Sequence, residues 1–246
     1  MGSRGRQAKG ERGPRKPSTP TPEDIRKVDS ALYRAYGRKD GARGVGDPLD
    51  GLILTMLSQN TSDVNSDRAF ARLKGAFPSW RAVLDADEAE VEEAIRPGGI
   101  SRVKARRIKE VLNIISERLG RLDLGVLRGW ATEDLRDFFL SLPGVGLKTA
   151  YVLLLFYYDR PTFPVDTHVY RLAVRLGWIP EGSGAERAHH VLDRMVPDEA
   201  KKTLHLNLIS HGRAVCTASK PRCRGCVISG YCARVGVGEG GPTREE

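Results

Sequence analysis

The spacing of the apolar residues is the feature that most constrains what this chain can fold into. Apolar side chains recur every three to four positions through most of the sequence, as at Ile25, Val28, Leu32 and Tyr36, and no segment alternates convincingly as a half-buried strand would. Breaks that contain glycine or proline separate these stretches. The pattern therefore predicts a nearly all-α fold. Helices are expected from a Thr21 N-cap with Pro22 at the first position to Gly37, around 49–57, and over 64–77, 79–84, 87–95, 104–118, 132–142, 148–157, 167–176, 185–195 and 198–210.

The two ends of the chain differ in composition from the rest. Residues 1–22 and 235–246 contain almost no large apolar side chain, so we expect a disordered basic tail and a flexible C-terminal tail. The first of these holds six basic residues and one acidic residue, a net +5 of the formal +9, which leaves the body mildly basic. Such a balance favours a polyanionic partner.

All four cysteines lie within one short stretch near the C-terminus. Cys216, Cys223, Cys226 and Cys232 are separated by six, two and five residues. Disulfides so close together would staple a chain of this length poorly, whereas four thiolates in a loop rich in Gly, Pro and Arg suit one metal site. This chemistry alone leaves structural zinc and a [4Fe-4S] cluster as alternatives.

A Pro- and Gly-containing turn joins two predicted helices at Leu142–Gly146. Gly144 and Gly146 can adopt backbone angles that are closed to other residues, and such a turn leaves N–H groups free to bind a DNA phosphate. A plain structural turn is the alternative. Lys148 follows in the first turn of the next helix, where a cation is disfavoured, so this position suits an amine that attacks in its neutral form. A solvated surface lysine is the alternative there.

These residues resemble a known family. The segment Leu142–Ala150, which reads LPGVGLKTA, and the segment Val165–Val169, which reads VDTHV, are similar to the helix-hairpin-helix, Gly/Pro-rich loop and aspartate signature of endonuclease III. The resemblance extends over about 23–234. It implies a base-excision DNA glycosylase with a [4Fe-4S] cluster on the four cysteines, whose spacing is similar to that of the family.

The resemblance also implies how the catalytic residues act. Lys148 would attack C1′ of a flipped-out nucleotide, expel the base and form a Schiff base, and elimination would then cut the strand. Asp166 would assist proton transfer and stabilise the positive charge on the sugar. Asp166 as a simple N-cap of the following helix is the alternative, and the two roles can coexist. We do not place His168 in the catalytic set, because a lone histidine early in a helix is more often structural.

Several residues are candidates for DNA contacts. A flipped base leaves a hole that a side chain must fill. Two loops resemble the family segments that reach it, and a solvated loop is the alternative for each. The family register places Asn60 at or beside the inserted position and Gln59 one residue earlier, while Ile100 or Arg102 would serve from the second loop. The expected DNA-binding residues are Gly144, Gly146, Gln59, Asn60, Ile100, Arg102 and, between the cysteines, Lys220, Arg222 and Arg224.

These expectations combine into one prediction. We expect an all-α protein with a helix-hairpin-helix lobe over 47–160 and a cluster lobe built from 23–45 and 161–234, with the active site in the cleft between the lobes. The predicted activity is that of a bifunctional glycosylase and AP lyase for oxidised pyrimidines such as thymine glycol. The alternatives are a mismatch glycosylase for thymine, uracil or adenine, and a non-catalytic iron–sulfur DNA-binding protein.

The expected partner and location follow from the same reading. The partner is double-stranded DNA with damaged bases or abasic sites, bound by a monomer. No stretch approaches the eighteen or so apolar residues of a membrane span, and no secretory signal is present, so we expect a soluble intracellular protein with no membrane partner. In a bacterium it would be cytoplasmic and nucleoid-associated, whereas the basic tail is also compatible with organellar or nuclear targeting.

Overall fold

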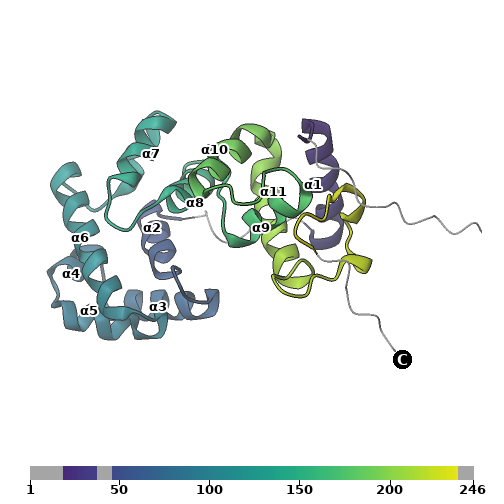
Figure 1. The fold of residues 1–246 in the computed structure, drawn as a ribbon. Helices are drawn as coiled ribbons and strands as arrows, with labels where there is room; N and C mark the ends of the chain where they lie inside the picture. Colours follow the sequence, from purple (N-terminus) through teal and green to yellow (C-terminus); the bar gives the residue numbers. More distant parts are fainter. Residues whose placement is uncertain (1–18, 38–45, 238–246) are drawn as a thin grey trace, which may run out of the picture. The chain divides into compact units, whose positions relative to one another are not determined.

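The computed structural model describes residues 19–37 and 46–237, which form helices and turns with no β-strand (Figure 1). The α-helices are α1 (Pro22–Tyr36), α2 (Pro48–Leu57), α3 (Asp63–Ala76), α4 (Trp80–Asp85), α5 (Glu88–Ile95), α6 (Ser101–Leu119), α7 (Thr132–Leu140), α8 (Leu147–Tyr157), α9 (Thr167–Leu176), α10 (Ala185–Met195) and α11 (Asp198–Ala214). Short 3₁₀ helices are η1 (Arg96–Gly98), η2 (Leu124–Gly129), η3 (Cys223–Gly225) and η4 (Ser229–Tyr231).

The helices form two compact units. The hairpin unit contains the described residues 46–164, with α2 to α8, and the cysteine unit contains 19–37 together with 165–237, with α1 and α9 to α11. The predicted all-α fold with two helical lobes is therefore confirmed. The cysteine unit is assembled from two stretches that are far apart in the sequence.

Helix α8 is the central helix of the hairpin unit. It packs against α2 and α7, and its side chains are buried around nearly its whole circumference, with Leu153 and Leu154 fully inaccessible. A Cβ atom on Gly51 of α2 would overlap the ring of Tyr157, so the glycine lets the two helices approach closely. The start of α8, and with it the turn after α7, is therefore held by a rigid core.

Helix α11 has the corresponding place in the cysteine unit. It packs against α1 and α9, and Leu204 and Leu208 are fully buried in its interface, as are Ile25 and Leu32 of α1. A Cβ on Gly212 would lie 2.9 Å from the Cβ of His168, so α9 and α11 also approach closely at this point. This packing fixes the start of α9, where Asp166 stands.

The helix boundaries test the local predictions. Thr21 caps α1 by accepting a hydrogen bond from the Asp24 N–H, Pro22 opens the helix, and Gly37 closes it with a φ of 75°, so the predicted first helix is confirmed. The prediction that the sixth helix begins at residue 104 was wrong, because α6 starts at Ser101, and η2 was not predicted at all.

Two further expectations concern the ends of the chain and the membrane. The predicted N-terminal tail falls outside the described residues up to residue 18, and the C-terminal tail does so from residue 238. None of the helices in the described part of the chain is long and apolar enough to cross a membrane.

Candidate active site and cysteine-lined pocket

The turn between α7 and α8 exposes backbone donors at the start of a buried helix. Val145 N–H donates to the Leu142 carbonyl at 3.2 Å, and Gly144 adopts a φ of +78°, which L side chains rarely do. Gly146 is the N-cap of α8 and offers no side-chain acceptor, so the first N–H groups of α8 have no side-chain cap. Both glycines are exposed. The turn therefore has the chemistry of an anion-binding helix start.

Lys148 is the second residue of α8 and its side chain is exposed, while the adjacent Thr149 and Ala150 are buried. No hydrogen bond or ion pair holds its amine within the described residues of the hairpin unit. The backbone of Lys148 is thus anchored by the core, whereas its Nζ is available to a substrate. A nucleophilic amine needs both properties.

Asp166 is the N-cap of α9. Its Oδ1 accepts a hydrogen bond from Val169 N–H at 2.7 Å, and no hydrogen bond to Oδ2 is found among the described residues of the cysteine unit. The capping role that the sequence allowed is therefore present. One carboxylate oxygen orients the side chain, and the other is left for a reacting group.

His189 holds the backbone just before Asp166, and no sequence pattern indicated this role. The ring is buried, its Nε2 accepts the Val165 N–H at 3.1 Å, and its Nδ1 lies 2.8 Å from the Ala185 carbonyl. These partners require a neutral ring that is protonated on Nδ1. His168 is partly buried, which lowers its pKa, and its Nδ1 accepts from Arg171 at 3.0 Å, as expected of a structural histidine.

Helix α9 also carries two arginines that hold the first cysteine. The Arg171 Nε donates to the Cys216 carbonyl at 3.0 Å. Arg175 is 8% exposed, and it donates to the Thr217 carbonyl at 2.7 Å, to the Ala218 carbonyl at 2.8 Å and to Cys216 Sγ at 3.2 Å. Helix α9, which Asp166 caps, is therefore tied to the cysteine loop by the hydrogen bonds that Arg171 and Arg175 donate around Cys216.

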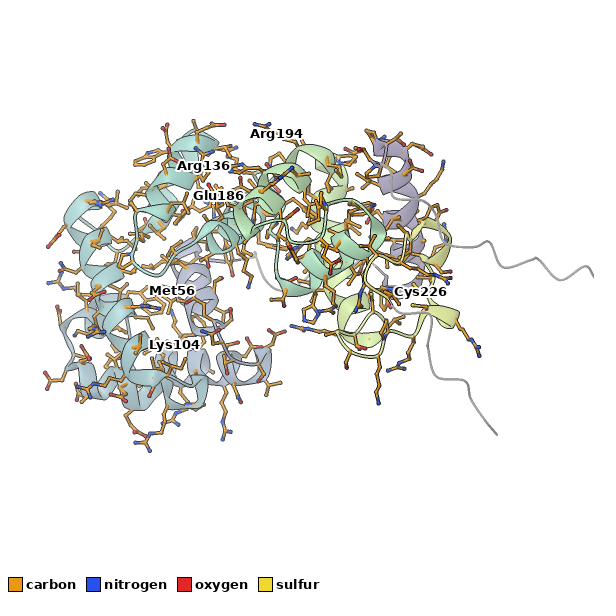
Figure 2. The ribbon with its side chains drawn as sticks, in the orientation of Figure 1. Met56, Lys104, Arg136, Glu186, Arg194 and Cys226 are labelled. Atoms are coloured by element: carbon orange, nitrogen blue, oxygen red, sulfur yellow. The ribbon has the colours of Figure 1, made fainter. Side chains whose placement is uncertain are left out.

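All four predicted cysteines line one small pocket of about 20 Å³, and no disulfide joins any of the four. His211 shares this pocket: its Nε2 lies 3.3 Å from Cys226 Sγ, and its Nδ1 lies 2.8 Å from the Tyr36 hydroxyl (Figure 2 labels Cys226). Burial lowers the pKa of His211 to about 4, so the ring is neutral and can donate one N–H to sulfur. Sequence reasoning missed His211.

The pocket's chemistry suits a thiolate-bound metal group. Burial, together with the charges of the three other cysteines, raises the pKa of Cys226 to about 11, so a bound cation is what would stabilise four thiolates together. No set of three or more His, Cys, Asp or Glu side chains in the described ranges is already arranged around one metal position. The residues present nevertheless fit a four-thiolate group: free sulfurs around one pocket, with N–H donors from Arg175 and His211 beside two of them.

The cations between the cysteines point to solvent. Lys220, Arg222 and Arg224 are exposed, and none forms an ion pair among the described residues. The Thr217 hydroxyl donates to the Lys220 carbonyl at 2.8 Å, which shapes the loop that presents them. These three residues are thus free for the phosphate contacts that the sequence predicted.

The two predicted insertion loops meet in the hairpin unit. Gln59, Asn60 and Ile100 line one pocket of about 30 Å³ together with Met56, Val103, Lys104 and Arg107 (Figure 2 labels Met56 and Lys104). Asn60 and Ile100 are exposed, whereas the Gln59 Nε2 donates to the Gly144 carbonyl at 2.9 Å. Arg102 is exposed but does not line this pocket. The structure thus separates the four candidates, with Asn60 and Ile100 exposed at one place.

The comparisons with known proteins agree with this geometry. Residues 53–198, more than half of the chain, match the family model described as "HhH-GPD superfamily base excision DNA repair protein". An Arabidopsis thaliana protein named "Putative DNA glycosylase" is 43% identical over 172 residues, which are 70% of this chain and only 58% of that protein. Endonuclease III of Thermotoga maritima is 32% identical over 196 residues, which are 78% of this chain and 87% of the relative.

A solved structure gives the same result for the fold. The protein in "Structure of a non-covalent Endonuclease III-DNA Complex" is 26% identical, superposes with a TM-score of 0.75, and is matched over 88% of this chain and 97% of that one. The predicted resemblance to endonuclease III is therefore confirmed. This chain belongs to the HhH-GPD superfamily of base excision DNA repair proteins and is a DNA glycosylase of that superfamily.

Proposed function

We propose that this chain is a bifunctional DNA glycosylase and AP lyase that removes oxidised pyrimidines, such as thymine glycol, from double-stranded DNA. The observation that carries the proposal is the placement of Lys148. Its backbone belongs to the first turn of a buried helix behind a Gly-rich turn, while its amine has no partner in the hairpin unit. A monofunctional glycosylase activates water and has no use for an amine in this place.

The reaction begins with the damaged nucleotide leaving the base stack, because its sugar is otherwise out of reach. The exposed N–H groups at Gly144 and Gly146 bind a backbone phosphate and bring the sugar to Lys148. The neutral amine then attacks C1′, and the C1′–N bond breaks with its electron pair leaving on the base, which takes up a proton. Loss of the amine proton and opening of the sugar give a Schiff base between Lys148 and C1′.

The second half of the reaction cuts the strand. The Schiff base acidifies C2′, a base removes a C2′ proton, and the electron pair expels the 3′ phosphate, so the C3′–O bond breaks. Water then hydrolyses the Schiff base and releases Lys148. Each group that leaves is balanced by a proton or a hydroxide from water, and no oxidant or reductant is consumed.

Asp166 serves the first half of this reaction in our proposal. Its negative charge stabilises the positive charge that develops on the sugar as the base departs, and its oxygen accepts a proton from the attacking amine. The free Oδ2 supports this assignment, because the Val169 N–H already fixes the carboxylate through Oδ1. The helix cap thus orients the catalytic oxygen.

The four cysteines hold a [4Fe-4S] cluster in our proposal. When bound, the cluster supplies a rigid, cationic iron–sulfide core that the four thiolates enclose. The loop that the cysteines close then presents Lys220, Arg222 and Arg224 to DNA. These three cations are exposed and form no ion pair among the described residues, so phosphate groups are suitable ligands for them. Zinc on the same four thiolates is the alternative that metal analysis decides.

Asn60 and Ile100 fill the space left by the flipped nucleotide. Both are exposed and line the same pocket, whereas the Gln59 amide is bonded to Gly144 and Arg102 lies outside the pocket. An amide can hydrogen-bond the base that has lost its partner, and an aliphatic side chain can replace the lost stacking. The partner in this proposal is duplex DNA, which the protein binds as a monomer.

Strand-cleavage assays separate this function from its alternatives. End-labelled duplexes with thymine glycol, thymine opposite guanine, uracil opposite guanine, or adenine opposite 8-oxoguanine are incubated with the protein, with and without later hot alkali. We expect cleavage of the thymine glycol duplex without alkali. Cleavage that needs alkali would mean a monofunctional glycosylase, and preference for a mismatch duplex would replace the proposed substrate.

A further inference from the structure

Lys104 is a buried cation that joins two segments of the hairpin unit. It is 7% exposed, and its Nζ donates to the Leu57 carbonyl at 2.7 Å and to the Gly98 carbonyl at 2.8 Å. Figure 2 labels Lys104. Leu57 is the last residue of α2, and Gly98 is the last residue of η1. A single ammonium group therefore caps the C-terminal carbonyls of two elements, where the peptide dipoles favour a cation.

Two or three residues after each of these carbonyls stands a residue with unusual backbone angles. Asn60 has a φ of 54° and Ile100 a φ of 49°, which is the left-handed region. Asparagine visits this region with little difficulty, but a β-branched isoleucine rarely does, so the surrounding structure must impose the conformation. The backbone of Lys104 contributes, because its N–H donates to the Ile100 carbonyl at 3.1 Å.

The charge of Lys104 makes this arrangement costly. No carboxylate forms an ion pair with it in the described part of the chain, and burial lowers its pKa. A methionine, which is nearly as long, would fill most of the same space without a buried charge. The ammonium thus serves the two carbonyls that it bonds, and through them the Asn60 and Ile100 loops, which share one pocket with it.

We propose that Lys104 is a positioning residue for DNA insertion, whose ammonium holds the Asn60 and Ile100 loops at a fixed spacing so that both side chains enter the duplex together. This inference rests on the insertion roles given to Asn60 and Ile100 in the proposed function. It predicts that removing the ammonium harms insertion more than it harms the fold.

The chain offers a matched control on the same helix. Lys109 is also on α6 and partly buried, and its Nζ donates to the Leu84 carbonyl at 2.8 Å and to the Ala86 carbonyl. Ala86 is the C-cap of α4, so Lys109 ties down a helix end as Lys104 does. It does not line the pocket with Asn60 and Ile100. Lys109→Met therefore removes the same kind of lysine without touching the insertion loops.

The experiment measures insertion directly. A duplex carries a stable, uncleavable abasic analogue with 2-aminopurine opposite, so its fluorescence reports the stacking of the opposite base and needs no chemistry at Lys148. We expect the wild-type protein and Lys109→Met to change the fluorescence at saturating concentration. Lys104→Met should lose this change and excise thymine glycol about tenfold to a hundredfold more slowly. Lys104→Arg, which keeps the two donors, should restore both.

Two outcomes would overturn the proposal. One is a fluorescence change in Lys104→Met equal to that of Lys109→Met, and the other is no change with the wild-type protein. If Lys104→Met unfolds, Lys104→Arg is compared with Lys104→Gln instead. The comparison is made at a temperature where circular dichroism shows that both variants are folded. Equal signals from that pair would reject a role of the charge. A wild-type signal without any strand cleavage would reject the lyase function and leave the role of Lys104 standing.

Coupling to the two insertion residues separates positioning from general stability. If Lys104 acts through Asn60 and Ile100, adding Lys104→Met to the double variant Asn60→Gly/Ile100→Ala should cause no further loss of excision. A further loss in the triple variant would show that Lys104 acts independently of these two side chains, and would reject the proposal.

Discussion

The Gln59 side chain donates a hydrogen bond from Nε2 to the carbonyl oxygen of Gly144, at 2.9 Å. This bond ties the loop after α2 to the turn between α7 and α8, within the hairpin unit. Gln59 is therefore fastened to the turn that we expect to bind phosphate, whereas its neighbour Asn60 is exposed.

Substitutions of these neighbours should have different effects. Gln59→Ala should lower the free energy of unfolding by about 1 kcal/mol, because the hydrogen bond between the loop after α2 and the Gly144 carbonyl is lost. Asn60→Gly keeps the left-handed backbone and removes the side chain, so it should change stability by less than about 0.5 kcal/mol and still abolish the 2-aminopurine response. Urea unfolding and fluorescence measure the two effects. The reverse pattern would assign insertion to Gln59.

Two substitutions of Asp166 should separate its effect on stability from its effect on catalysis. Asp166→Asn keeps an oxygen that can accept the Val169 N–H, so its stability should stay within a few tenths of a kcal/mol of wild type, while Asp166→Ala should cost about 1 kcal/mol. Both should lose most of the glycosylase rate, because both lack the negative charge. An active Asp166→Asn protein would reduce Asp166 to a helix cap. Single-turnover excision and thermal unfolding supply the measurements.

The cysteines should carry iron and labile sulfide. Purified protein should show the broad visible absorption of an iron–sulfur cluster, and Cys223→Ser should lose most of its iron. Loss of the cluster should also loosen α9, because Arg171 and Arg175 bond the Cys216 segment. Hydrogen exchange in α9 of Cys223→Ser should therefore rise, while exchange in α8 of the hairpin unit should stay unchanged. Stoichiometric zinc without iron in the wild-type protein would contradict the cluster assignment.

Because of Asp29, the free energy of unfolding of the protein should depend on pH. Its Oδ1 is buried without a hydrogen-bond partner, and burial raises its pKa from 3.8 to about 6. The folded state therefore binds the carboxyl proton of Asp29 more tightly than the unfolded state does. The contribution of this proton to the free energy of unfolding is fully present below pH 3.8 and is lost as the pH rises through about 6.

Asp29→Asn removes this dependence. It should be more stable than wild type by about 1 kcal/mol at pH 7.5, after allowance for the partial exposure of the carboxyl group, and the difference should vanish near pH 4. Unfolding in urea across this pH range checks the sign. A variant that is less stable than wild type at pH 7.5 would mean that the ionised carboxylate has a favourable partner.

Local patterns were sufficient for most of the helices, because capping residues and apolar spacing act over a few neighbouring residues. The Thr21 cap, Pro22 and Gly37 define α1 in this way. The start of α6 was mispredicted because Ile100 stands in the left-handed region immediately before it, and no propensity indicates that for an isoleucine.

The contacts that shape the candidate sites depend on the tertiary fold. The spacing of the cysteines was sufficient to predict that they share one site, and they line one pocket. By contrast, three other placements arise only when segments distant in sequence pack together. His189 then bonds the Val165 N–H, His211 lies beside Cys226, and Lys104 lies between two carbonyls. A single sequence does not indicate which of its polar side chains will be placed in this way.

Borohydride trapping of the wild-type protein and Lys148→Ala, on a thymine glycol duplex and on an abasic duplex, tests the central claim most directly. We predict a covalent protein–DNA adduct with both duplexes for the wild-type protein and none for Lys148→Ala, with both proteins equally folded by circular dichroism. Base release by the wild-type protein without an adduct, or an adduct that persists in Lys148→Ala, would contradict Schiff-base chemistry at Lys148.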